Sequence, residues 1–169
     1  HSVLALFEGV ATGAADGYAR MAGKPAAVLL HLGPGLGNGL ANLHNARRGY
    51  TPIVNIVGDH ATYHAQYDAP LQSDIESIAQ GVSGWIRSAD STERLQYDAA
   101  DAVAASFGPP GQVATLILPA DVCWLDSDGP VAPAERPQPR TVEASTLAQI
   151  LEVVRSGEPT AFLLAGSSL

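Results

Sequence analysis

The chain has 169 residues, of which 46% are hydrophobic and 15% are charged, a composition typical of a folded globular protein rather than a disordered one. Its net charge of −8 and its 9 scattered lysines and arginines argue against a nucleic-acid partner. No apolar stretch reaches the roughly 18 residues of a membrane span, and no basic-then-apolar leader opens the chain, so we expect no membrane partner and a cytoplasmic location. The single cysteine, Cys123, cannot form an internal disulfide and is expected to be buried.

In chain order, the first predicted element is a strand over residues 3–7, which ends at Glu8 and is followed by an alanine-rich helix over residues 10–21. Further strands are predicted at residues 26–30, 52–57, 85–87 and 113–118, and further helices at residues 38–48, 71–80 and 91–107. Continuous apolar strands that alternate with helices indicate a parallel sheet covered on both faces. The predicted fold class is therefore α/β, a three-layer α/β/α domain with a parallel sheet.

The domain organisation follows from a change in composition near residue 125. Residues 1–125 are expected to form the α/β domain, which starts without a preceding element, and residues 126–143 form a proline-rich linker. Residues 144–169 are expected to begin a second α/β domain, with a helix at residues 146–155 and a strand at 160–165. Both ends look cut, so we expect a fragment of a longer protein.

Glu8 is the first candidate for chemistry. An ionised side chain that directly follows an apolar strand loses hydration and needs a partner or a task. Open α/β sheets bind their ligands just beyond the carboxyl ends of the strands, which is where Glu8 is expected. The structural alternative is a carboxylate that only stabilises the start of the following helix.

The glycine-rich segment of residues 33–37, predicted as a loop, invites a nucleotide-binding interpretation. Gly33 and Gly35 fit the first two glycines of the dinucleotide fingerprint, but Asn38 occupies the place of the third. No Gly-Lys-Ser/Thr sequence follows that would complete a phosphate-binding loop. A nucleotide-binding module is therefore disfavoured, and a simple tight turn is the alternative.

Three histidines follow predicted strand ends. His31 precedes the glycine segment and could relay protons at neutral pH, or could be a core histidine that donates to a carbonyl. His60 and His64 have the spacing of two metal ligands on a helix. Residues 59–70 are instead predicted to form a loop over the same crevice, and no third ligand is evident, so no metal site is predicted in this chain.

The amino-acid sequence of several segments resembles that of the pyrimidine-binding domain of thiamine-diphosphate enzymes, in the group of acetolactate synthase and benzoylformate decarboxylase. The resemblance extends from about residue 3 to residue 122 and rests on Glu8-Gly9-Val10-Ala11-Thr12-Gly13-Ala14-Ala15-Asp16-Gly17-Tyr18-Ala19-Arg20, Gly23-Lys24-Pro25 and Gly33-Pro34-Gly35-Leu36-Gly37-Asn38. It implies that residues 1–125 are a pyrimidine-binding domain without its N-terminal element. Residues 144–169 would then begin the central domain of such an enzyme.

The resemblance also implies roles for residues. Glu8 matches the glutamate that binds the cofactor and activates it by donating a hydrogen bond to the pyrimidine ring nitrogen. Gly33, Pro34, Gly35 and Asn38 match the segment that packs beside this ring. His31 matches a histidine of benzoylformate decarboxylase and would be catalytic, handling protons near the substrate. The segment with Asp59, His60 and His64 is similar to the loop that lines the cleft in this family, which implies a substrate-facing role as the alternative to a metal site.

The implied function is that of a thiamine-diphosphate enzyme acting on 2-oxo acids, as a homodimer or homotetramer that shares each site between subunits. The Gly-Asp-Gly motif that holds Mg²⁺ and the diphosphate in this family does not occur in the sequence, so a domain absent from this chain would supply it, and the chain alone would be inactive. The overall sequence is more similar to the synthase group, which favours acetolactate synthesis by decarboxylation and carboligation. His31 and Leu71 instead favour a benzoylformate-decarboxylase-like reaction. A non-catalytic scaffold or regulatory paralogue is the alternative of another class, against which the intact Glu8 argues.

Overall fold

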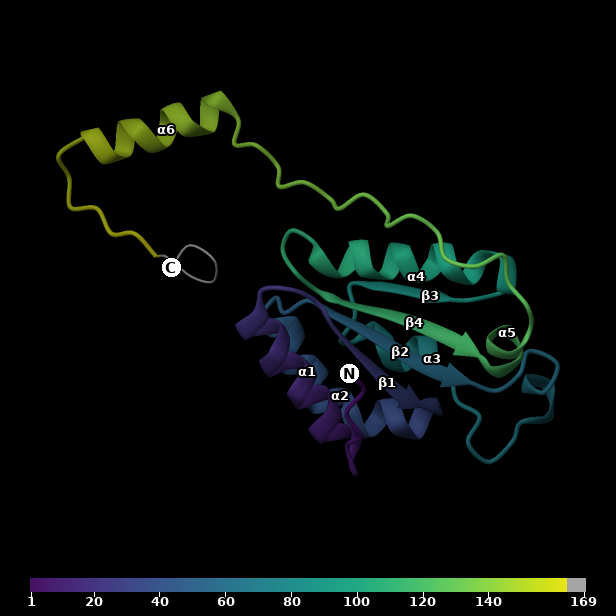
Figure 1. The fold of residues 1–169 in the computed structure, drawn as a ribbon. Coiled ribbons are helices and arrows are strands. Elements are labelled where there is room, and N and C mark those ends of the chain that lie inside the picture. The colour runs from purple at the N-terminus through teal and green to yellow at the C-terminus, as the bar shows by residue number, and fades with distance from the viewer. Residues whose placement is uncertain (164–169) are drawn as a thin grey trace. The chain divides into compact units, whose positions relative to one another are not determined.

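The structure, a computed structural model, describes residues 1–163 (Figure 1). It contains two compact units, His1–Pro137 and the residues from Gln138 onward. The domain boundaries predicted at residues 125 and 143 stay predictions.

A four-stranded parallel sheet in the order β1-β2-β4-β3 organises the first unit. Its strands are β1 (Ala26–His31), β2 (Ile53–Asp59), β3 (Trp85–Ser88) and β4 (Val113–Pro119). The helices are α1 (Glu8–Ala22), α2 (Leu32–Arg48), α3 (Ile75–Gln80), α4 (Thr92–Phe107) and α5 (Ala120–Trp124), with a 3-10 helix η1 (Ala65–Tyr67) after β2.

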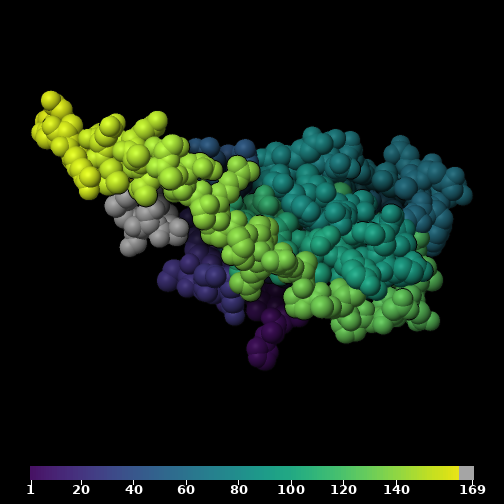
Figure 2. Space-filling model, turned by 90° about the horizontal axis from the view of Figure 1, so that it is seen from above, coloured from purple at the N-terminus to yellow at the C-terminus, as the bar shows by residue number. Residues whose placement is uncertain are grey.

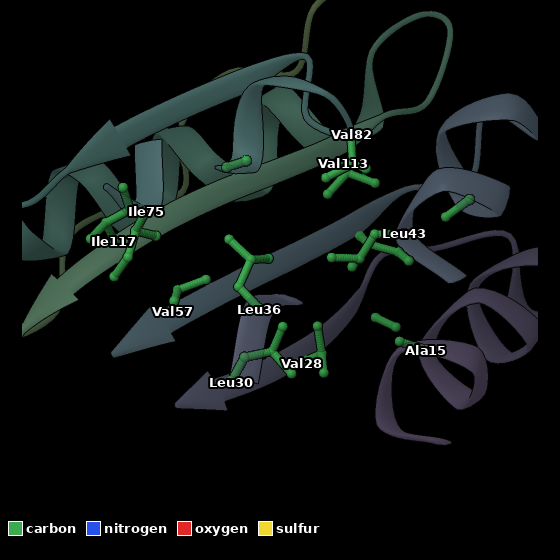
Figure 3. Close-up of a cluster of buried hydrophobic side chains, with 14 of the residues drawn as sticks. Ala15, Val28, Leu30, Leu36, Leu43, Val57, Ile75, Val82, Val113 and Ile117 are labelled. Atoms are coloured by element: carbon green, nitrogen blue, oxygen red, sulfur yellow. The ribbon is translucent and has the colours of Figure 1, made fainter. Parts of the chain in front are cut away.

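Helices cover both faces of this sheet. On one face, α1, α2 and α3 pack on the strands through the larger of two apolar clusters, which includes Leu36, Leu43 and Val57 (Figure 3). On the other face, a second cluster joins α4 and α5 to the sheet through Ala102 and Val122. The predicted three-layer α/β/α architecture with a parallel sheet is confirmed.

The chain that follows α5 has no regular structure up to α6 (Ala144–Arg155), as the proline-rich composition predicts. Within the first unit it runs back along α4, where the Cζ atom of Arg136 lies 3.7 Å from the centre of the Phe107 ring (Figure 2). In the second unit, α6 matches the predicted helix. Residues 160–163 are not in a strand, and the rest of the strand predicted at 160–165 lies outside the described residues.

The strand predicted over residues 3–7 is wrong. Residues 1–5 have no regular structure, residues 6 and 7 form a bend, and Phe7 immediately precedes α1. Among the described residues, the outer edge of β1 is unpaired and this apolar run is not hydrogen-bonded to it, so the run has no ladder that would hold it as a strand.

The loop predicted at residues 33–37 is also wrong, because α2 begins at Leu32, directly after β1. Leu32 has a φ of 57°, which lets the chain turn from strand to helix within one residue. A Cβ atom at Gly33 would lie 2.1 Å from Ser73 Oγ, so a glycine is needed for close packing here rather than for a turn. Cys123 was expected to be buried, but it is exposed because it lies on the outer side of the short helix α5.

The buried acid Asp98 is expected to contribute to the stability of the fold. Asp98 is 1% exposed and accepts a hydrogen bond from Arg87 Nη1 at 2.7 Å, and this bond is the main reason why the pKa of Arg87 is raised. Replacing Asp98 with alanine should lower the free energy of unfolding by about 1–2 kcal/mol, because Arg87 loses its buried partner but is itself 37% exposed and keeps Asp101. Asp101→Ala is the control: this acid binds the same Nη1 at 2.9 Å, but its side chain is 44% exposed, so its loss should cost less than about 1 kcal/mol. Equal losses in urea unfolding would contradict this account.

Candidate functional site

The candidate site lies where the first two strands of the sheet end. The arrowheads of β1, β2 and β4 point to the same end of the sheet (Figure 1). His31, the last residue of β1, pairs in register with Gly58 of β2. The start of α2 and the segment after β2 therefore meet at one edge, which is where open parallel sheets bind ligands.

Glu8 is the first residue of α1, rather than the residue after a strand, and it is half-buried. Its Oε2 atom accepts a hydrogen bond of 3.1 Å from Nδ2 of Asn38, on α2. Its Oε1 atom has no hydrogen-bond partner among residues 1–163. The carboxyl group is therefore oriented through one oxygen and open through the other.

Two hydrogen bonds, one buried and one partly buried, fix α1 against α2 next to this carboxyl group. The hydroxyl of Thr12 donates to the carbonyl of Gly39 at 3.1 Å, and Nδ2 of Asn42 donates to the carbonyl of Gly9 at 2.6 Å. A Cβ atom at Gly39 would lie 2.9 Å from Thr12 Cγ2, so the glycine allows this close approach. Glu8 and Asn38 are thus held on two helices that cannot slide independently.

Gly35 brings Glu8 and His31 together. A Cβ atom built at Gly35 would lie 3.6 Å from Glu8 Oε1 and 3.6 Å from the Cβ of His31. The missing side chain therefore leaves open the space beside the free carboxyl oxygen. The donor set suits an aminopyrimidine ring, because its ring nitrogen needs an acid to hydrogen-bond and Glu8 Oε1 has no partner among residues 1–163.

The structure places four of the six predicted site residues together and the other two apart from them. It brings together Glu8, His31, Gly35 and Asn38, and His31 is exposed. Gly33 instead packs against Ser73, and Pro34 is exposed in the first turn of α2. The catalytic and cofactor-binding roles of all six residues stay predictions.

A clamp that the sequence analysis missed holds the segment after β2. Asp121 Oδ1 accepts a hydrogen bond of 3.0 Å from the backbone N–H of Thr62, and Asp121 Oδ2 accepts one from the Thr62 hydroxyl. These bonds lower the pKa of Asp121, the hydroxyl contributing most. The available signal was an acid three residues after the strand predicted at residues 113–118, since the carboxyl ends of parallel strands share one edge.

The clamp predicts a pH-dependent order of this segment. Because folding lowers the pKa of Asp121, the clamp is fully formed above the ordinary value of 3.8 and is lost as the pH falls through the lowered value. Asp121→Ala should speed amide exchange at Thr62 near neutral pH, whereas the exposed Asp126→Ala should not. The difference between wild type and Asp121→Ala should vanish in acid. Equal protection of the Thr62 amide at neutral pH would show that the clamp is not formed in solution.

Metal binding has no support in the described part of the chain. No group of three or more His, Cys, Asp or Glu side chains in residues 1–163 could hold a metal ion. In the same residues, no helix is long and apolar enough to cross a membrane.

Comparison with known proteins agrees with this geometry. Residues 1–81 match the family described as "Thiamine pyrophosphate enzyme, N-terminal TPP binding domain". The chain is 59% identical over 166 residues to "Putative acetolactate synthase large subunit IlvX" of Mycobacterium tuberculosis, covering 98% of this chain and 32% of the relative. It is 29% identical over 120 residues to benzoylformate decarboxylase of Pseudomonas aeruginosa, covering 70% of this chain and 23% of the relative.

The structural comparison gives the same result. Benzoylformate decarboxylase from Polynucleobacter necessarius matches with a TM-score of 0.79 and 26% identity, over 90% of this chain and 29% of the other. Fold and geometry define an α/β domain whose candidate site lies at the carboxyl ends of a parallel sheet. More particularly, the chain belongs to the thiamine-diphosphate enzyme family and contains its N-terminal, pyrimidine-binding domain. It spans about a third or less of the length of these relatives.

Proposed function

We propose that the protein carrying this chain is a thiamine-diphosphate-dependent enzyme that acts on 2-oxo acids, and that Glu8 activates the cofactor. The observation that carries this proposal is the carboxyl group of Glu8, bound by Asn38 through Oε2 and open through Oε1 beside Gly35. Thiamine diphosphate, when bound, supplies the nucleophilic carbon and the electron sink that decarboxylation of a 2-oxo acid requires.

The chain's own residues orient the cofactor and hold protons. Asn38 donates to Glu8 Oε2, so the proton of the acid form lies on Oε1, where it can be donated to the pyrimidine ring nitrogen. Gly35 keeps the space in front of Oε1 free of a side chain. His31, exposed at the end of β1, would accept or give a proton at a ring nitrogen near the reacting carbonyl.

Two reaction outcomes have separate support. The 59% identity to the Mycobacterium tuberculosis relative favours acetolactate-synthase-like decarboxylation and carboligation. The position of His31 beside Gly35, together with 29% identity to benzoylformate decarboxylase, favours non-oxidative decarboxylation as the second candidate. Mg²⁺, held with the diphosphate by a domain outside this chain, a homodimer or homotetramer with shared sites, and a cytoplasmic location all stay predictions.

The test uses the full-length protein with thiamine diphosphate and Mg²⁺. Calorimetry should detect cofactor binding, and product analysis with pyruvate should detect acetolactate. Benzaldehyde from benzoylformate, lost in His31→Ala, would favour the decarboxylase instead. Failure to bind the cofactor would overturn the proposal and favour a non-catalytic scaffold or regulatory paralogue.

A further inference from the structure

The segment after β2 begins and ends against the candidate site. It starts beside His31, because His31 is the register partner of Gly58. Fifteen residues after Gly58, Ser73 lies against Gly33 in the first turn of α2, within 2.2 Å of where a Cβ of Gly33 would be. Both ends of this segment, residues 59–73, are thus fixed at the edge of the sheet where Glu8 and Gly35 lie.

The middle of the same segment is also fixed. The clamp from Thr62 to Asp121 ties it to the start of α5, beyond the end of β4. Within it, the ring centres of His60 and His64 are 5.3 Å apart, and His64 lies edge-on to Tyr67 with 5.6 Å between ring centres. The two imidazoles therefore form one packed group on a segment with three anchor points.

This group contains buried nitrogens that the described residues leave unused. His60 Nε2 and His64 Nδ1 are both inaccessible to solvent and have no hydrogen-bond partner in residues 1–163. A buried polar atom without a partner costs free energy, so such atoms are normally paired with protein, water or a ligand. Two such nitrogens lie on neighbouring rings of a segment anchored at the site edge, so a polar group that reached this segment could satisfy both.

We propose that His60 and His64 bind the carboxylate of the 2-oxo acid substrate, an inference that rests on the proposed function. A neutral imidazole carries one N–H group, so the pair can donate two hydrogen bonds to two carboxylate oxygens without being charged. The acids on the same edge would not compete for these donors. Asp59 Oδ1 accepts from the backbone N–H of His60, and both oxygens of Asp121 accept from Thr62.

His60 and His64 would also orient the substrate for the reaction. With a net charge of −8, the chain offers little general attraction for an anion, so dedicated donors are needed to hold one. Holding the carboxylate at the β2 end would present the neighbouring carbonyl toward the β1 end, where Glu8 and His31 lie. His60 and His64 would thus be substrate-binding residues, distinct from the proposed proton-handling pair.

The first experiment compares a charged substrate with a neutral analogue in the full-length holoenzyme. The probes are whichever of pyruvate and benzoylformate the wild type turns over, and the amide of that acid as a competitive inhibitor. The double variant His60→Phe/His64→Phe keeps ring volume and removes the N–H groups. It should raise KM for the acid roughly 10- to 100-fold, the loss expected for hydrogen bonds to a charged group. The inhibition constant of the amide should rise much less, because its neutral carbonyl oxygen accepts a weaker hydrogen bond and its NH₂ group accepts none. The control His44→Phe, on the exposed side of α2, should change neither.

The second experiment needs no substitution at the pair and so does not depend on the folding of the variant. Nitrogen NMR of the wild-type holoenzyme, with His60 and His64 assigned, should show both imidazoles shifting on addition of the acid, and shifting less on addition of the amide. Equal weakening of acid and amide in the variant, or imidazoles that do not respond to the acid, would overturn the proposal. If the wild type binds no thiamine diphosphate, the proposed function itself fails and this inference falls with it. Cofactor binding and turnover with an unresponsive pair would reject this inference alone.

Discussion

Glu8→Gln should slow deuterium exchange at C2 of bound thiamine diphosphate by about 10²- to 10⁴-fold, the range in which a positioned acid or base contributes to catalysis. Glutamine has nearly the same volume, and its side-chain oxygen can still accept the hydrogen bond from Asn38. The amide group then faces the space beside Gly35, where it can donate a hydrogen bond but cannot transfer a proton. Exchange measured by proton NMR in the full-length holoenzyme isolates this step from substrate binding.

The matched control for this substitution is Glu76→Gln, on the exposed surface of α3. It makes the same chemical change away from the site and should leave the exchange rate at the wild-type value. Both variants should unfold at the same urea concentration as the wild type. An exchange rate in Glu8→Gln equal to that of Glu76→Gln would remove Glu8 from the catalytic machinery.

Gly35→Ala should weaken thiamine diphosphate binding by about 10- to 100-fold, as expected for a methyl group forced into a well-fitted space. The added Cβ would lie 3.6 Å from Glu8 Oε1, in ordinary contact with the protein but in the space that the pyrimidine ring is proposed to need. Because alanine is favoured over glycine in a helix by about 1 kcal/mol, the folded protein should not lose stability. The effect on binding should therefore be separable from any effect on folding.

Gly37→Ala, two residues further along the same helix, is the control for this prediction. A Cβ atom there would have no heavy atom within 4 Å, so the substitution adds the same methyl group at an open position. Calorimetric titration with the cofactor should give a wild-type dissociation constant for Gly37→Ala. Equal cofactor affinity in both alanine variants would mean that the ring does not occupy the space beside Gly35.

The hydrophobic pattern was sufficient to predict the three layers, but not the structure of the segments at residues 3–7 and 33–37. The apolar strands β2 and β4 are recognisable because they are buried on both faces, and α4 because its apolar positions recur at helical spacing. The same pattern misled at residues 3–7, because an apolar run forms a strand only where a neighbouring strand can pair with it. Glycine content misled at residues 33–37, where it serves close packing within α2 rather than a turn.

The sequence predicted which residues form the candidate site, but not the contacts between them. Glu8, Gly35 and Asn38 were identified by sequence resemblance to the family. In the structure they meet through contacts between α1 and α2, which no local sequence pattern predicts. The clamp between Thr62 and Asp121 joins residues 59 positions apart, so it depends on the sheet order. Sequence reasoning could place both residues at one edge of the sheet but could not pair them.

The most direct test is a crystal structure of the full-length protein with thiamine diphosphate and Mg²⁺, refined well enough to place the pyrimidine ring. Our account predicts that ring beside Gly35, with its nitrogen within hydrogen-bonding distance of Glu8 Oε1 and Asn38 still bound to Oε2. A ring bound elsewhere, with the Glu8 carboxylate in an ion pair or facing bulk solvent, would contradict it.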